Sequence, residues 1–422
     1  MLTPLVLAAD YAGTAVLNDR TDVRGRFTMA HTPGAPTSYT GGLDLVTTPS
    51  AYMLVNDRRW SLSLGYTPSF TATEIETGWN PEVFQLAGVG IGWHNRFVTV
   101  SLGDAVSFGT FNSAYLFQPG AQPSGSATPP AAAAGTQGLP TTGLQLVPQP
   151  QAIYFGSNRT TASVAAVTDR RSSFSLGGSF GLSGGLDDNS RLVEPDQRAI
   201  EGDASFSHQV TRTDGSLTVA SVTDLNFKGA LCFTPDGKIV PGVTCRPDDQ
   251  IFLLTENFIH AFDKTTSLSV GAGPQFIRAR PDVAVPYTSS WYPGGQLSVS
   301  HQYAKQGLAS LLVTAEFFAL PDFRTGLVTE RAQLDATVVD IIDPRLSLSI
   351  AAGAGQTFPV DSPIAATIVR GNVEADYKTD KAKLVALVGG LSAQFESQDP
   401  FGYFFSIFGY FAVTVATPTL RF

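Results

Sequence analysis

The sequence is poor in charge and in the residues from which metal and catalytic sites are usually built. Only 15% of its 422 residues are charged, against about 25% in ordinary globular domains. It contains 2 Cys and 5 His. The histidines, His31, His94, His208, His260 and His301, are scattered singly and lack the close spacing of metal ligands. We therefore expect no metal site and no cofactor.

A transmembrane helix and a basic region are also missing from the sequence. No run of about 20 apolar residues occurs, which is the length that a membrane-spanning helix needs. The net charge is −9 and no basic stripe is present, which argues against nucleic acid as a partner. If the chain meets a membrane, it must therefore cross it as strands of a closed barrel, because open sheet edges cannot be satisfied in lipid.

The dominant pattern is an alternation of apolar with small or polar residues. In residues 60–71, Trp60, Leu62, Leu64 and Tyr66 alternate with serine, glycine and threonine. The same period returns in residues 267–276, 328–338 and 346–353. Successive side chains of a strand point to opposite faces, so each segment has one apolar face and one small, polar face. The pattern predicts an all-β protein.

Tight polar turns separate these segments at regular intervals. They are centred on Asp57, Asn95, Arg170, Asp214, Lys264, Gln306, Pro344 and Thr379. Longer connections lie between them, and the longest, residues 118–150, is a low-complexity stretch rich in Pro, Ala and Gly. Short turns at one end and long loops at the other are typical of outer-membrane barrels. We count about eighteen strands, and sixteen remains possible because the pattern in residues 11–29 and 39–55 is weak.

The chain ends on the long aromatic segment Phe404–Phe422. Alternate positions back from the end are Phe422, Leu420, Pro418, Ala416, Thr414, Ala412, Tyr410 and Phe408. This ending resembles the C-terminal strand of bacterial outer-membrane β-barrels of the porin type, although Pro418 and Thr414 depart from the pattern. The resemblance implies a transmembrane antiparallel up-and-down β-barrel in the bacterial outer membrane. It also implies that Leu420 and Phe422 help to close the barrel and that the barrel-assembly machinery binds this strand.

The first residues and the two cysteines each allow two interpretations. Residues 1–9 are short and apolar and end in small residues, as in the remnant of a signal peptide, or they lead into the first strand. Residues 10–422 would then form one barrel domain. Cys232 and Cys245 lie in one Pro- and Gly-rich stretch, which favours a disulfide in an oxidising compartment over two free thiols.

Two short motifs resemble part of a catalytic site, and two acidic pairs resemble cation ligands. Residues 177–181 and 181–185 match the GxSxG pattern, but no helical period follows them, as a nucleophile elbow requires. Catalysis is therefore not expected. The acidic pairs at residues 187–188 and 248–249 are expected in loops, where they are solvated, bind Ca²⁺ or bridge lipopolysaccharide.

The polar face of the strands is the candidate functional surface. Its charged residues of interest for permeation are Arg24, Arg26, Glu201, Asp203, Arg331, Asp335, Arg370 and Glu374, and Asp224 and Asn226 are expected on the same inner face. Both signs occur, so the lumen is expected to be hydrated without a strong charge filter, or its charges pair and brace the wall. Trp60, Tyr66, Trp93, Tyr377 and Tyr410 suit aromatic girdles at the membrane interfaces, unless they are buried core residues.

An eighteen-stranded barrel is wide enough to contain an aqueous channel. The leading hypothesis is therefore a porin-like channel for hydrophilic solutes or for an exported polymer such as polysaccharide, handed over by a periplasmic partner. The alternative is a non-conducting barrel that anchors a cell-surface assembly. Lipid and lipopolysaccharide of the outer membrane are the other expected partners.

Overall fold

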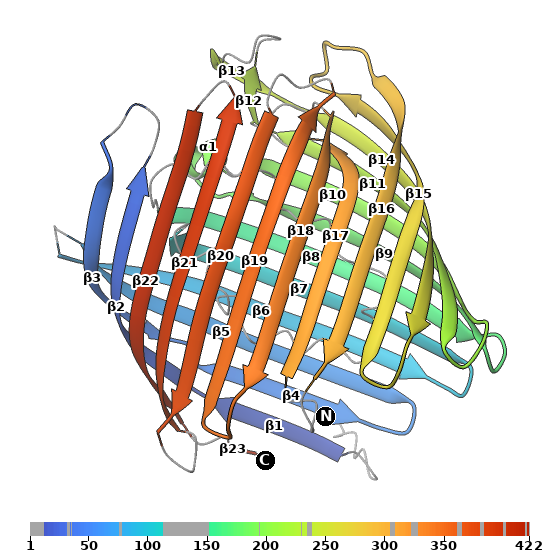
Figure 1. Cartoon of the computed structure of the whole chain (residues 1–422), viewed down its shortest axis with the longest axis horizontal. Coiled ribbons are helices and arrows are strands. Elements are labelled where there is room, and N and C mark those ends of the chain that lie inside the picture. Colours follow the sequence, from blue (N-terminus) through green and yellow to red (C-terminus); the bar gives the residue numbers. More distant parts are fainter. Residues whose placement is uncertain are drawn as a thin grey trace, which may run out of the picture.

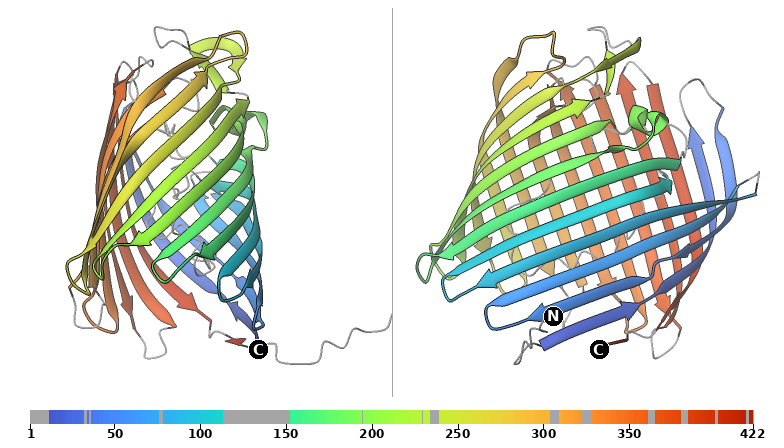
Figure 2. Two further views of the ribbon diagram at one scale, coloured as in Figure 1. Left: turned by 90° about the vertical axis from the view of Figure 1, so that its right-hand side faces the viewer. Right: turned by 180° about the vertical axis from the view of Figure 1, so that it is seen from behind.

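Nearly all of the described chain is antiparallel strand. The computed structural model describes residues 12–31, 34, 36–75, 78–112, 152–193, 195–228, 230–233, 239–303, 309–321, 328–360, 365–379, 384–399, 402–417 and 420–421. Its tilted strands close into a barrel (Figures 1 and 2). Residues 1–9, residues 118–150 and Phe422 lie outside this part, so the expectations about them stay predictions.

The elements follow one another along the chain with few interruptions. The first half contains β1 (Ala12–Asn18), β2 (Arg20–His31), β3 (Ser38–Thr47), β4 (Ser50–Asn56), β5 (Trp60–Ile75), β6 (Gly78–His94), β7 (Val98–Asn112), β8 (Ala152–Val167), β9 (Ser172–Gly185), the short helix α1 (Asp188–Val193), β10 (Asp196–Gln209) and β11 (Asp214–Lys228). The second half contains β12 (Ala230–Phe233), β13 (Ile239–Cys245), β14 (Asp248–Ala261), β15 (Thr266–Arg280), β16 (Thr288–Gln302), β17 (Ala309–Pro321), β18 (Val328–Ile341), β19 (Leu346–Pro359), β20 (Ala365–Lys378), β21 (Val385–Asp399), β22 (Gly402–Ala416) and β23 (Leu420–Arg421). No helix of the described residues is long and apolar enough to cross a membrane.

The barrel has eighteen strands, as expected. Its sheet contains 21 segments, and three neighbouring pairs of segments, β1 with β2, β3 with β4 and β22 with β23, are single strands with a local interruption. One interruption falls at Pro49, between the pairs Thr47↔Phe70 and Ala51↔Tyr66. Proline has no N–H for the ladder, which explains the break. β12 and β13 form a separate hairpin. The side chain of Cys232 in this hairpin lies outside the described part, so its pairing with Cys245 stays a prediction.

The last strand closes the barrel in two registers. β22 pairs with β2, with Arg20 opposite Ala416, whereas β23 pairs with β1, with Val16 opposite Arg421. These two pairings differ by one residue, and a shift of one residue reverses the face to which every following side chain points. Leu420 pairs opposite Leu17, and the roles of Leu420 and Phe422 in closing the barrel stay predictions.

This shift corrects the predicted face of the terminal strand. Upstream of it, Phe411, Val413 and Val415 are the exposed apolar side chains, whereas Phe408 and Ala412 are buried. Tyr410 shares the inner face and donates a hydrogen bond to Glu374, so it is not part of an outer aromatic girdle. The predicted face of Tyr410 assumes that the alternation runs without interruption from Phe422 back to Phe408.

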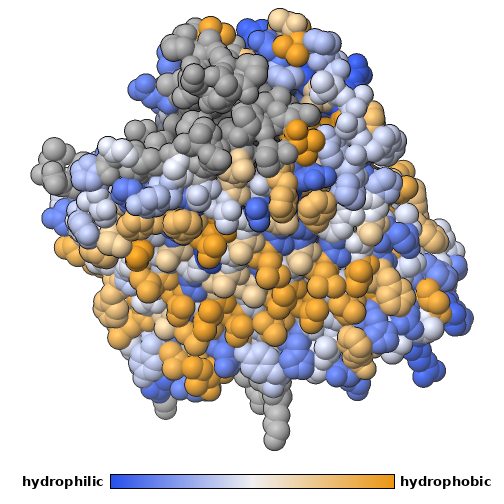
Figure 3. Space-filling view, turned by 45° about the horizontal axis from the view of Figure 1, so that its top comes forward, coloured by the Kyte–Doolittle hydropathy of each residue, from blue (hydrophilic) through white to orange (hydrophobic). Residues whose placement is uncertain are grey.

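The outer face of the barrel is apolar. Figure 3 shows a band of hydrophobic side chains across its wall. Trp60 (54% exposed), Tyr66 and Tyr377 lie on this face, and Trp93 lies beside Trp60 with ring centroids 6.4 Å apart. Their membership of a girdle remains a prediction.

Two carboxylates interrupt the apolar outer face in the middle of strands. Asp104 accepts a hydrogen bond from the Thr160 hydroxyl at 2.6 Å, and Glu256 accepts one from Thr218. Exposed apolar neighbours, such as Leu102 before Asp104, flank both along their strands. A carboxylate on a lipid-facing wall is costly, and the threonine hydroxyls partly offset that cost.

The short turns at the end of the barrel near β1 and β23 are held by aspartate side chains. Asp263 accepts hydrogen bonds from the backbone N–H groups of Thr265 and Thr266, at 2.6 and 2.8 Å, and from the Thr265 hydroxyl at 2.6 Å. These bonds, led by that of the hydroxyl, lower the pKa of Asp263 from 3.8 to about 2. The neighbouring lysine, Lys264, is left exposed.

The capped turn predicts a specific response to acid. A depressed pKa in the folded state means that Asp263 stabilises the hairpin above pH 3.8, and that this contribution is lost as pH falls from 3.8 towards 2. An NMR titration of the Asp263 carboxyl in micelles should give a midpoint near 2. The variant Thr265→Val, which removes the hydroxyl donor, should raise that midpoint. A midpoint near 3.8 in the unaltered protein would contradict this account of the turn.

Candidate functional site: the inner wall of the barrel

The alternation along each strand identifies the residues that face the lumen. In β10, the exposed apolar residues Ile200 and Phe206 lie on the outer face, so Glu201 and Asp203 face inward. The same reasoning places the other predicted charges, Arg24, Arg26, Arg331, Asp335, Arg370 and Glu374, on the inner face. Their role in permeation stays a prediction.

Most of these charges lie in one sector of the wall, on β18, β20 and β2, which we call the charged sector. Arg370 Nη2 lies 2.7 Å from Asp335 Oδ1, and Gln333 donates a hydrogen bond to the same carboxylate. Arg331 occupies the same face of β18 two residues before Gln333. The two strands that carry this ion pair are separated by β19.

Gly353 of β19 lies between the two charged partners, opposite both Asp335 and Arg370. A Cβ atom at this position would lie 2.3 Å from Asp335 Oδ1 and 2.9 Å from Arg370 Nε. The ion pair therefore crosses over the backbone of Gly353 and requires a residue without a side chain there.

The charged sector continues around the closure of the barrel. The guanidinium of Arg24 lies over the ring of Tyr410, 4.9 Å from its centroid, and the Tyr410 hydroxyl bonds Glu374. Tyr410 thus connects two predicted residues, Arg24 and Glu374, across strands that meet only because the barrel is closed. Arg26 Nε lies 2.9 Å from Oδ1 of Asp44, which is buried.

Glu201 and Asp203 lie apart from this sector. Arg159 of β8 reaches across β9 to Glu201, with Nη2 2.5 Å from Oε2, and the Ser179 hydroxyl donates to the same oxygen at 2.8 Å. Sequence reasoning had missed Arg159 and Asp44. The position of Arg159 on the small, polar face of its alternating segment was the available signal.

The inner wall of β7 to β10 carries many hydroxyl groups beside the Arg159–Glu201 pair and Asp203, and we call it the serine sector. Cross-strand pairs of serine hydroxyls lie within hydrogen-bond distance: Ser101 and Ser163 at 2.6 Å, Ser107 and Ser157 at 2.6 Å, and Ser175 and Ser205 at 2.7 Å. A hydroxyl both donates and accepts hydrogen bonds. The hydroxyl groups of this sector can therefore exchange hydrogen bonds with an uncharged hydroxylated molecule.

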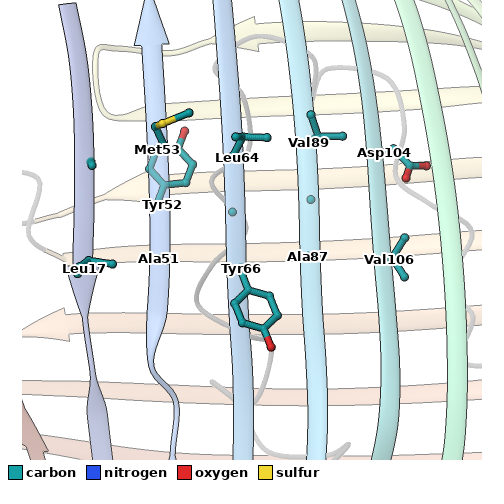
Figure 4. A pocket seen from close by; sticks show the side chains of 13 residues that line it. Leu17, Ala51, Tyr52, Met53, Leu64, Tyr66, Ala87, Val89, Asp104 and Val106 are labelled. Atoms are coloured by element: carbon teal, nitrogen blue, oxygen red, sulfur yellow. The ribbon is translucent and has the colours of Figure 1, made fainter.

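A shallow groove of about 480 Å³ lies on the opposite surface of the wall (Figure 4). Its lining includes Leu17, Met53, Leu64, Val89 and Val106, from β1 and β4 to β7. Leu17, Leu64 and Val89 are exposed on the outer face. The groove therefore faces lipid and is not part of the lumen.

The side chains that could act as metal ligands are dispersed over the part of the chain that the structure describes. No group of three or more His, Cys, Asp or Glu side chains converges on a point within the described ranges. Several charges of the inner wall are paired with charges of the opposite sign, as in Arg370 with Asp335 and Arg159 with Glu201. Hydroxyl groups occur on β7 to β10, and an apolar cluster that includes Phe227, Ile251 and Ile277 lies on the inner face of β11, β14 and β15. Paired charges and hydroxyl groups are suited to contact with a hydrophilic molecule.

Comparison with known proteins identifies one matching sequence family and many solved barrel structures of similar fold. The model of the EpsX exopolysaccharide export family matches residues 7–387. No curated protein sequence matches the chain.

Among solved structures, OpdL of Pseudomonas aeruginosa is 11% identical (TM-score 0.44, 96% of this chain and 99% of that chain). OccK2 of the same organism, solved with glucuronate, is 9% identical (TM-score 0.46, 95% and 98%). The copper transporter OprC is 10% identical (TM-score 0.50, 90% and 64%). The last of these likenesses shows a shared barrel fold and nothing more.

The crossing over Gly353 can be tested by adding one methyl group. Gly353→Ala should separate Arg370 from Asp335, because the new Cβ would occupy their space, and such overpacking costs about 1–3 kcal/mol of unfolding free energy. Urea unfolding of the refolded barrel measures this loss. Gly355→Ala is the matched control, since its Cβ would lie 3.5 Å from the nearest atom, the carbonyl oxygen of Ala332. Equal stability of the two variants would refute the crossing.

Proposed function

The chain belongs to the EpsX exopolysaccharide export family, and we propose that its barrel is the outer-membrane conduit through which the polymer leaves the cell. It acts as a passage and not as an enzyme. The observation that carries this proposal is the division of the inner wall into a charged sector with paired charges and a serine sector. A polysaccharide presents hydroxyl groups along its length, and the serine sector offers matching partners.

The paired charges support movement instead of tight binding. A conduit must hold its cargo weakly enough at each position for the cargo to leave. Arg370 with Asp335, and Arg159 with Glu201, satisfy each other and leave no strong field of one sign. The conduit therefore tolerates neutral polymer as well as small hydrophilic solutes.

A periplasmic partner that delivers the polymer is part of the proposal. The turns at the periplasmic end carry exposed cations, including Arg58, Arg96, Arg170, Lys264 and Arg345. Where aspartates cap these turns, as Asp263 does, their carboxylates are bonded to the turn itself. An acidic surface on the partner would complement these cations. Assembly through the C-terminal strand remains a further expectation of the outer-membrane barrel.

Conductance in planar bilayers tests whether the barrel is open. The refolded protein should give stable steps of nanosiemens scale, because an eighteen-stranded wall encloses an aqueous lumen. A deletion of residues 118–150, which lie outside the described part, forms a second arm. Current only in the deletion would make that segment an obstruction. No current in either protein, with the barrel shown to be inserted and folded, would favour the alternative function, a non-conducting barrel that anchors a surface assembly.

Added bulk in the serine sector should block the polymer. Ser175→Trp places a large ring inside the wall, and we expect secreted polymer to fall roughly twofold or more because the passage narrows. Leu176→Trp is the matched control, since Leu176 is 49% exposed on the outer face. Secreted polysaccharide is measured per folded barrel in the membrane. Unchanged secretion by Ser175→Trp would argue against passage along this sector.

A further inference from the structure

Polar side chains cover one region of the outer wall, which is otherwise mainly apolar. At the end of the barrel away from the short turns, one row across β10, β11, β14 and β15 consists of Arg198, Asn226, Asp248 and Arg280. The next row towards the middle of the barrel contains Asp224, Gln250 and Arg278. We call these seven residues, with Tyr287 beside them, the rim patch.

The rim patch faces outward, contrary to the expectation for two of its members. Asp224 stands opposite Ile200, which is exposed on the outer face. Cross-strand partners share a face, so Asp224, and Asn226 two residues further, also point outward. Asp248, expected in a loop, begins β14.

An aromatic row lies directly below the patch and fixes its height. It consists of Phe252, Phe276 and Trp291, neighbours in the ladder of β14, β15 and β16. Their ring centroids are 6.1 Å apart for Phe252 and Phe276 and 5.0 Å apart for Phe276 and Trp291. Trp291 is 70% exposed. Aromatic residues gather at the membrane interface, so the rim patch lies at the level of the lipid headgroups of the outer leaflet.

Two arginines of the patch are available for an anion. Asp248 is already bonded by Arg280 Nη2 at 2.7 Å and by the Tyr287 hydroxyl. Arg278 is exposed, and its guanidinium lies 3.9 Å from the centroid of the Tyr287 ring, which orients it. Neither Arg278 nor Arg198 has an ion-pair partner in the part of the chain that the structure describes.

The patch also has polar atoms that its own side chains leave unsatisfied. Asp224 Oδ1 and Arg280 Nε are buried and have no hydrogen-bond partner among the described residues. Asn226 and Gln250 add amide donors and acceptors next to them. A ligand that carries hydroxyl groups as well as a negative charge would complement these amides and the two arginines without an ion-pair partner.

We propose that the rim patch is a binding site for a phosphorylated glycolipid of the outer leaflet. Arg198 and Arg278 bind its phosphates, since guanidinium groups pair with phosphate through two parallel hydrogen bonds. Asp224, Asn226 and Gln250 bind the hydroxyl groups of its sugars. The acyl chains lie along the aromatic row. The site is on the outer surface and is independent of the proposed passage through the lumen.

The test compares lipid binding by the full-length refolded barrel and by two charge-matched variants. The probe is lipid A, the phosphorylated disaccharide lipid of the outer leaflet, and bound lipid is counted by native mass spectrometry. Arg198→Gln with Arg278→Gln should weaken binding about tenfold, because two charge-assisted contacts are lost. Arg170→Gln with Arg171→Gln, exposed residues of a periplasmic turn, should leave binding unchanged.

Two further arms decide what the patch recognises. Dephosphorylated lipid A should bind as weakly to the unaltered protein as lipid A binds to the rim variant, and phosphatidylglycerol, which lacks the sugars, should compete poorly. Equal binding of lipid A to all variants, or equal binding of the dephosphorylated lipid, would overturn the proposal. Circular dichroism checks folding. Bilayer conductance of the rim variant should match that of the unaltered protein, so a failed conduit and a failed lipid site give different results.

Discussion

The closed hydrogen-bond ladder is the constraint on which the whole structure depends. In a membrane every backbone N–H and C=O must find a partner within the protein, so the sheet must return to its first strand. Here the return needs two registers, because β22 pairs with β2 while β23 pairs with β1 one residue out of step. This closure places Tyr410 between Arg24 and Glu374. The geometry of the wall thus determines which charges meet in the lumen.

The ladder also imposes the chemistry of the two surfaces. Alternation gives one face to lipid and the other to the lumen, and where the inner face has small residues, longer side chains of neighbouring strands can reach over them. Gly353 allows Arg370 to meet Asp335 across β19, and Ser179 shares Glu201 with Arg159 across β9. Charges that brace the wall in this way are neutralised, so these parts of the lumen surface consist of paired ions and hydroxyl groups.

The eighteen strands, the short turns and the inward direction of the eight permeation candidates could be predicted from the sequence, because alternation and turn residues are local signals. The face of Tyr410 could not be predicted, since the shift of one residue between the pairings of Ala416 and Leu420 is invisible to a periodic pattern. The partners Asp44 and Arg159 could not be predicted either, because a periodic pattern gives the face of a side chain but not the side chain that it meets on another strand. Asp224 and Asn226 were assigned to the wrong face because a polar residue near the end of a strand can face either the lumen or the lipid headgroups.

The central claim is that the exported polymer passes along the inner wall. It is tested most directly by placing a photo-crosslinking amino acid at Ser101, which faces the lumen and bonds Ser163, or at the adjacent Leu102, which is 51% exposed on the outer face. Illumination of cells that are secreting polymer should attach polysaccharide to the barrel at position 101 and not at position 102. Attachment at neither position, in barrels that are folded and in cells that still secrete, would contradict the account.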